Sequence, residues 1–131
     1  MRLLLDTHTF IWAAAGVEHL HRLSAPARRA ITDRSNDTLV SAASAWEMAT
    51  KHRLGRLDIV ARIVGQWNEA LARLPAIDLS VTSEHALLAG GLVGAPGDPF
   101  DRLLAAQAII EDAYLVTADR AMHGLGAQLL W

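Results

Sequence analysis

The feature that most constrains the fold is an alternation of short apolar runs with longer segments of helical periodicity. The short runs, rich in leucine and β-branched residues, predict strands at residues 2–5, 38–40, 77–79, 114–116 and 127–131. Between them, apolar residues recur every three or four positions and predict helices over residues 7–15, 42–53, 59–74 and 99–112. Because strands and helices alternate, we expect an α/β fold, a three-layer sandwich with a central parallel sheet flanked by helices.

Turn and capping residues predict where several helices begin and end. Ser24 and Asp98 can each accept a hydrogen bond from the first turn of a helix, and Pro99 suits the first helical position. Asp58 is a candidate cap of the helix over 59–74, and Thr82 or Ser83 can begin a further short helix. The loosest loop is expected at Gly90–Gly97, which is too short to link two domains.

Length and composition limit the class of protein. A chain of 131 residues with 52% apolar residues predicts one domain, residues 1–131, with ample core. The chain contains no cysteine, so a thiolate metal site and a cysteine nucleophile are excluded. The formal net charge of -2 excludes a broadly basic surface but not local binding of RNA. The N-terminal apolar run ends early at Asp6, so we expect no membrane segment and a cytoplasmic protein.

Four acidic residues occupy positions from which they can meet. Asp6 and Asp119 each follow a predicted strand, whereas Asp101 lies in the first turn of a predicted helix. The carboxyl ends of parallel strands share one edge of a sheet, and Glu47, on the helix after the second strand, can point to the same edge. Clustered carboxylates need a cation, and Mg²⁺ or Mn²⁺ prefers oxygen ligands. This pattern predicts metal-assisted phosphodiester hydrolysis.

Each acid also has a purely structural interpretation, because Asp and Glu collect at helix starts and strand ends. Capping is a sufficient explanation for Asp98, whereas Asp101 remains available to face a pocket. Glu47 lies between Trp46 and Met48, and an acid in such apolar surroundings is harder to explain as a solvated helix face.

Four segments resemble the motifs of PIN domains, and their order and spacing are similar to those of VapC-type toxins. The resemblance extends from the first strand to the C-terminal Trp131, and four motifs in order are much more specific than any one alone. The segments are Leu4-Leu5-Asp6-Thr7-His8, Trp46-Glu47 with Lys51 and Gly55-Arg56-Leu57, Asp98-Pro99-Phe100-Asp101-Arg102, and Leu115-Val116-Thr117-Ala118-Asp119.

The resemblance implies an endoribonuclease that uses Mg²⁺ or Mn²⁺, forms a homodimer and is inhibited by a cognate VapB-like antitoxin. The acids that match the catalytic and metal-binding residues of the family are Asp6, Glu47, Asp101 and Asp119. Thr117 matches the small hydroxyl residue near the last acid. Asp98 is an additional candidate metal ligand, although we expect Asp101 to be the closer one.

Several other residues have competing interpretations. Arg102 and Lys51 could contact substrate phosphate, but an ion pair with a carboxylate is the favoured role of both. His8 is expected to pack or to form hydrogen bonds, because the histidines show no zinc-binding spacing. The tryptophans could stack on bases, but core packing is favoured for most of them. Arg28, Arg29 and Arg34 could follow an RNA backbone, but a solvated face is the favoured interpretation. Candidates for the antitoxin surface are Trp67, Leu71 and the region Arg53–Ile63.

Three alternative functions differ in how well they fit the sequence. An aspartyl phosphatase needs a second Asp two residues after the first, and His8 occupies that position. A PIN-like binding module that has lost its metal is disfavoured by the complete acidic set. A PIN nuclease that processes cellular RNA without an antitoxin would have the same active-site residues, so it stays open.

Overall fold

Five parallel strands form the centre of the molecule, in the order β3-β2-β1-β4-β5. The computed structural model describes residues 1–55, 58–94 and 96–131. The middle strand β1 pairs with β2 on one side and β4 on the other, so that Leu4 lies opposite both Leu39 and Leu115. The strands are β1 (Arg2–Leu5), β2 (Asp37–Ser41), β3 (Ile77–Leu79), β4 (Tyr114–Val116) and β5 (Leu129–Leu130).

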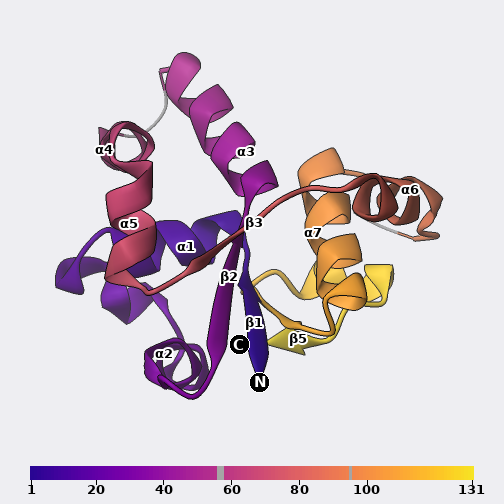
Figure 1. Cartoon of the computed structure of the whole chain (residues 1–131), viewed down its shortest axis with the longest axis horizontal. Helices are drawn as coiled ribbons and strands as arrows, with labels where there is room; N and C mark the ends of the chain where they lie inside the picture. The colour runs from indigo at the N-terminus through magenta and orange to yellow at the C-terminus, as the bar shows by residue number, and fades with distance from the viewer. Residues whose placement is uncertain (56–57, 95) are drawn as a thin grey trace.

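Helices cover both faces of this sheet, as Figure 1 shows. Alternate side chains of β1 enter different cores, because neighbouring residues of a strand point to opposite faces. Leu3 and Leu5 pack with α1 (Thr7–Ala14), α2 (Ala25–Thr32), α4 (Asp58–Gly65) and α5 (Trp67–Arg73). Leu4 packs with α7 (Pro99–Ile110) and η2 (Arg120–Leu125), a short 3₁₀ helix. The predicted three-layer α/β sandwich is therefore confirmed.

Three of the predicted capping residues, Ser24, Asp98 and Thr82, cap helices as the sequence predicts. The side chain of Ser24 accepts a hydrogen bond from the Ala27 N–H at 3.2 Å, and Asp98 accepts one from the Phe100 N–H at 2.8 Å. Thr82 caps α6 (Ser83–Gly91) together with the buried His85. The helix α3 spans Ala42–Arg53, the predicted bounds.

One predicted helix is in fact two. The apolar stripe over 59–74 was expected to belong to a single helix, but the chain breaks between α4 and α5 at Gln66, whose φ is -134° and ψ is 48°. Gly65 precedes the break, and glycine weakens a helix interior by about 1 kcal/mol relative to alanine. Asp58 lies within the first turn of α4, not before it. The sequence also did not predict the two 3₁₀ helices, η1 (Val17–Arg22) and η2.

Two residues expected on a partner surface are part of the core. The exposed fraction of Leu71 is 7%, and the half-buried ring of Trp67 packs edge-on against Phe10, with ring centroids 5.2 Å apart. Of the expected region Arg53–Ile63, Val60 and Ile63 are also buried, Arg53 to Gly55 are exposed, and Arg56 and Leu57 lie outside the described residues.

The tryptophans are less buried than expected. Trp46 is 61% exposed and Trp131 is 36% exposed, whereas Trp12 and Trp67 are half-buried against the core. A core role is therefore wrong for Trp46. In the part of the chain that the structure describes, no helix combines the length and apolar character needed to cross a membrane.

Candidate active site

A cavity of about 210 Å³ lies where the carboxyl ends of β1 and β4 meet the starts of α1, α7 and η2. It brings together all five acids that the sequence singled out. Other pockets of the molecule are larger, but the five acids are assembled in this one. The residues around it are Asp6, Thr7, His8, Glu47, Asp98, Asp101, Leu104, Thr117 and Asp119.

Three of these acids also cap helices. Asp6 caps α1 by accepting the Thr9 N–H at 2.7 Å, and Asp119 caps η2 by accepting the Ala121 N–H at 3.0 Å. Asp98 accepts the Phe100 and Asp101 N–H groups at 2.8 and 3.1 Å. Each cap uses one oxygen, Oδ1, so the local sequence that starts the helix also fixes the carboxylate at the cavity wall. In the described structure the second oxygen of each remains available for a ligand.

Glu47 reaches the cavity from α3 and is held by two neighbours, Thr7 and Lys51. The buried Thr7 hydroxyl donates a 2.6 Å hydrogen bond to Glu47 Oε1. Because this uses the single Thr7 proton, the buried Ser44 hydroxyl, 2.9 Å away, donates to Thr7 Oγ1. Lys51, one turn further along α3, lies with its Nζ 3.2 Å from Glu47 Oε2. Both carboxylate oxygens of Glu47 are thus oriented, and the ion pair that we favoured for Lys51 is present.

Burial and the other acids of the cavity change the pKa of Asp101. Burial, followed by the charges of Asp98, Glu47, Asp119 and Asp6, raises the pKa of Asp101 from its usual value of 3.8 to about 6. The half-buried carboxyl therefore experiences each of the other four acids as a nearby negative charge. A bound cation would relieve this repulsion.

The donor set fits a hard divalent cation, because every acid offers carboxylate oxygen and the site has neither thiolate nor a pair of histidines. In the described residues no three Asp, Glu or His side chains converge closely enough to form a ready-made metal cage. The acids line the wall of the cavity instead. This suits Mg²⁺, which keeps several waters and takes only one or two protein carboxylates.

Two supporting residues have different surroundings from each other. Thr117 is buried at the cavity, and its hydroxyl accepts the Asp119 N–H at 3.0 Å, which helps to position that acid. Arg102 turns away from the acids and donates to the carbonyl oxygens of Leu92, Ala89 at 3.0 Å and Gly94 at 3.2 Å. In the described part of the chain no carboxylate pairs with Arg102, so the favoured ion pair is wrong for this residue.

His8 and two hydroxyl residues are the additions that the structure makes to the predicted set. His8 is exposed at the rim, with its ring centroid 6.0 Å from that of Trp12, so it is not a packed core residue. Thr7 donates a hydrogen bond to the Glu47 carboxylate, and Ser44 in turn forms a hydrogen bond with Thr7. Their sequence signals were weak but present, since Thr7 directly follows Asp6 and Ser44 lies one helical turn before Glu47.

Comparison with known proteins identifies the family of the chain. Residues 3–127 match the family model described as PIN domain. Over 123 residues the chain is 33% identical to ribonuclease VapC22 of Mycobacterium tuberculosis. The aligned region covers 92% of this chain and 88% of that protein.

Solved structures show the same fold. VapBC2 from Rickettsia felis, bound to a DNA fragment from its promoter, has a TM-score of 0.67 at 16% identity, over 100% of this chain and 98% of that chain. VapBC-1 from nontypeable Haemophilus influenzae has a TM-score of 0.57 at 17% identity, over 99% of this chain and 97% of that chain. At these identities the structural likeness concerns the fold alone, whereas the family model spans nearly the whole sequence. Motifs, acidic cavity and family match together lead to one conclusion: the chain belongs to the PIN domain family.

Proposed function

We propose that the protein is an endoribonuclease that hydrolyses RNA phosphodiester bonds with Mg²⁺ or Mn²⁺ and acts as the toxin of a VapBC-type pair. The observation that carries the proposal is the assembly of Asp6, Glu47, Asp98, Asp101 and Asp119 around one cavity. The relative at 33% identity is a ribonuclease, and neighbours of similar fold are VapBC proteins. These comparisons support the activity and the type of partner.

The site residues divide into ligands and supports. A divalent ion at the cavity would polarise the phosphoryl group, activate a water and neutralise charge on the leaving oxygen. Asp6, Glu47, Asp101 and Asp119 would hold it, and Asp98 stands close enough to raise the pKa of Asp101. Thr7 and Lys51 keep the Glu47 carboxylate in place, and Thr117 does the same for Asp119. No side-chain nucleophile is needed.

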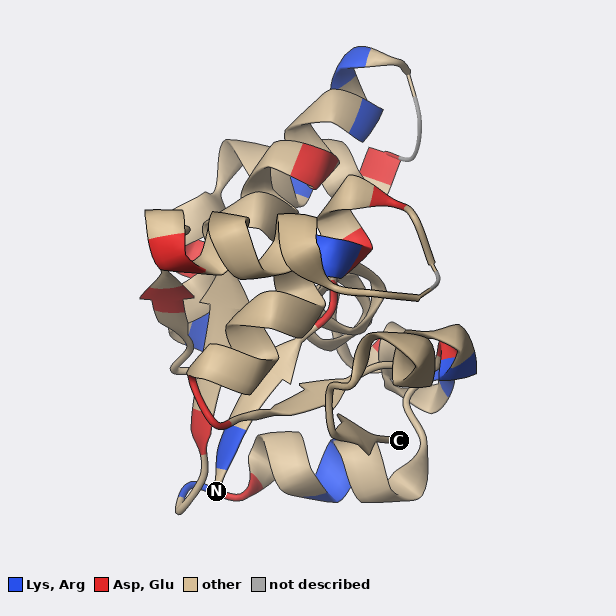
Figure 2. Ribbon diagram, turned by 90° about the vertical axis from the view of Figure 1, so that its right-hand side faces the viewer, with Lys and Arg blue, Asp and Glu red and all other residues tan. Residues whose placement is uncertain are grey.

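RNA would be bound locally. Figure 2 shows basic segments scattered among acidic ones, without a broad basic face in this view, in keeping with the net charge of -2. Attraction of a phosphodiester therefore depends on the metal and on individual cations near the cavity.

The proposed function also includes two protein contacts, a homodimer and a VapB-like antitoxin in the cytoplasm. Both follow from family resemblance. Co-expression with the gene beside its own tests the antitoxin: a stable complex that suppresses RNA cleavage is expected. An active nuclease whose neighbouring gene products neither bind nor inhibit it would instead be an RNA-processing PIN nuclease.

The deciding experiment is cleavage of mixed cellular RNA by the purified chain. We expect cleavage with Mg²⁺ or Mn²⁺ and none with EDTA, and we expect Asp6→Asn to abolish it. Glu69→Gln is the matched control. Glu69 is an exposed acid on α5, so this substitution removes one negative charge at a site away from the cavity. Equal cleavage by Asp6→Asn and the wild type would contradict the proposed site. No cleavage by folded wild-type protein in any metal would favour a binding module.

A further inference from the structure

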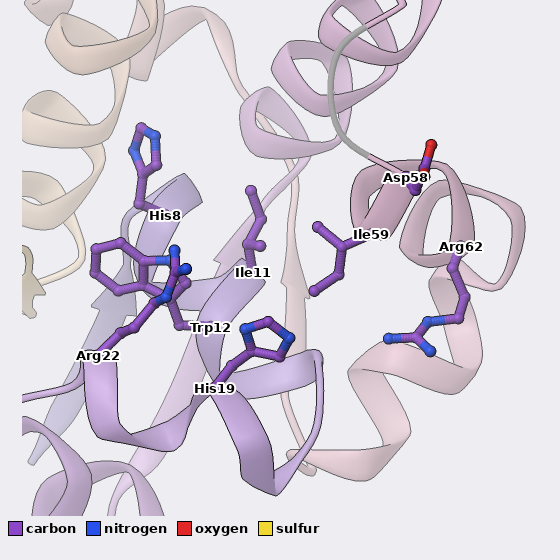
Figure 3. Close-up of a pocket in the computed structure, with 8 residues that line it drawn as sticks. All are labelled: His8, Ile11, Trp12, His19, Arg22, Asp58, Ile59 and Arg62. Carbon is purple, nitrogen blue, oxygen red and sulfur yellow. The ribbon is translucent and has the colours of Figure 1, made fainter.

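A second pocket opens beside the acidic cavity and shares His8 with it. Its volume is about 490 Å³, within the usual range of small-molecule sites. The pocket lies between α1, η1 and α4, and Figure 3 shows Ile11 and Ile59 between the Trp12 indole on one side and Arg62 on the other. Its walls are therefore apolar and aromatic, with cationic groups around them.

Aromatic rings lead from the acidic cavity into this pocket. The ring of His8 lies 6.0 Å from that of Trp12, measured between centroids, and both residues line this pocket. Trp131, whose ring lies 6.1 Å from that of Trp12, lines a different pocket. Aromatic side chains in such a row are platforms on which the bases of single-stranded RNA stack. The row begins at the residue that borders both cavities.

Among the residues that line the pocket, two arginines outnumber one aspartate. Arg22 is exposed on η1, and Arg62 donates a hydrogen bond to the Ala15 carbonyl oxygen at 3.2 Å. The carboxylate of Asp58 points away from the other labelled side chains in Figure 3. Glu18 lies 3.9 Å from His19, whose ring faces the pocket. Arg22 and Arg62 both line the pocket and are exposed, so either could contact a phosphate group there.

We propose that this pocket binds one nucleotide of a single-stranded RNA next to the phosphodiester at the acidic cavity, with its base against Trp12 and a phosphate at Arg22. The proposal rests on the proposed function. An aromatic wall with arginines, continuous with a site for phosphodiesters, complements a nucleotide in both shape and charge. A segment of a protein partner is the competing occupant, because part of the expected antitoxin region also borders this pocket.

The test is binding of a fluorescent single-stranded RNA hexamer of random sequence, measured by anisotropy in EDTA and again in Ca²⁺. Trp12→Ala is expected to weaken binding about 10-fold or more, and Trp12→Phe to restore most of it, because stacking needs only an aromatic face. Arg22→Gln is expected to weaken binding about 3-fold and to lower the salt slope by about 1. Arg34→Gln, an exposed arginine in the turn before β2 at the opposite end of the sheet, is the control for lost charge.

The outcomes separate this proposal from the proposed function. Arg22 is exposed, so its variant tests the pocket even where Trp12→Ala fails to fold. If Arg22→Gln affects RNA binding no more than Arg34→Gln, or if the wild type binds no RNA in either condition, the nucleotide pocket is wrong. RNA binding that depends on Trp12 and Arg22 without any cleavage would contradict the nuclease and support the pocket.

Discussion

At the scale of single residues, capping and site chemistry coincide in this protein. Asp6, Asp98 and Asp119 were each explicable as helix caps, and each is one. All three nevertheless line the same cavity. A cap occupies one carboxylate oxygen and anchors it to backbone N–H groups, which leaves a rigid second oxygen for another ligand. Capping therefore does not distinguish acids that line the cavity from acids that do not, and it is not a sufficient explanation for the position of Asp98.

The first residue-scale prediction concerns Thr7. Its hydroxyl orients Glu47 from a fully enclosed position, so Thr7→Val, which keeps the shape and removes the donor, should raise the Mg²⁺ concentration for half-maximal cleavage by about 10-fold or more. Thr7→Ser should stay near the wild type. The measurement is cleavage rate against Mg²⁺ concentration. If the valine variant matches the serine variant, Thr7 has no part in positioning Glu47.

The second residue-scale prediction concerns pH. The pKa of Asp101 is about 6 in the folded protein and near 3.8 when unfolded, so the folded state binds more protons between these values. Ionisation of Asp101 therefore lowers the free energy of unfolding of the metal-free protein progressively as pH rises from about 4 to about 6. Above that range this destabilisation is complete. Asp101→Asn should have a higher Tm than the wild type at pH 7.5, and the difference should shrink at pH 5. A difference that is constant with pH would contradict the assigned electrostatics.

At the scale of elements, strands and caps were predictable and packing-dependent details were not. β1, β3 and β4 coincide with the predicted runs because their leucine-rich and β-branched residues have no helical periodicity. The break at Gln66 was not predicted, because the apolar stripe of the sequence continues through it. The η1 and η2 segments are single short 3₁₀ helices, and such short elements have no periodic pattern. Most of the tryptophans were expected in the core, yet Trp46 is exposed and packs against Phe100, with ring centroids 4.8 Å apart.

The element-scale prediction concerns Arg102, which joins α7 to the segment after α6. Its guanidinium donates to the carbonyl oxygens of Leu92 and Gly94 just ahead of the Asp98 cap. Arg102→Ala should lower the free energy of unfolding by about 2 kcal/mol, since several charge-assisted hydrogen bonds are lost from a half-buried group. Urea denaturation measures the loss, with Arg34→Ala as the exposed control. Equal stability of the two variants would show that these hydrogen bonds contribute little.

At the scale of the whole molecule, the parallel sheet explains why acids from distant parts of the sequence meet. Because β1 and β4 are paired, with Leu5 opposite Val116, Asp6 and Asp119, which follow these strands, line the same cavity. The α/β alternation predicted that these strand ends share an edge. It could not predict which acids lie within reach of one another, because that depends on how α3 and α7 pack over the edge.

The negative charge of the five acids around the cavity means that a bound metal ion should increase the stability of the whole fold. Five carboxylates around one cavity repel one another, and the pKa of Asp101 is raised first by burial and then by the charges of the other four acids. A cation that binds the folded chain alone stabilises it by about 2.7 kcal/mol when its concentration is 100 times its Kd. For a domain of this size such a gain corresponds to a rise in Tm of roughly 10 °C.

We therefore expect Mg²⁺ or Mn²⁺ to raise the Tm of the wild type at pH 7.5 in a concentration-dependent way, measured by differential scanning calorimetry. Asp6→Asn should lose most of the increase, whereas Glu69→Gln should keep it, because Glu69 lies outside the cavity. This measurement needs no substrate, so it separates the metal site from the choice of RNA. If Asp6→Asn responds to metal as strongly as the wild type, the stabilising cation binds elsewhere and the acidic cavity is not its site.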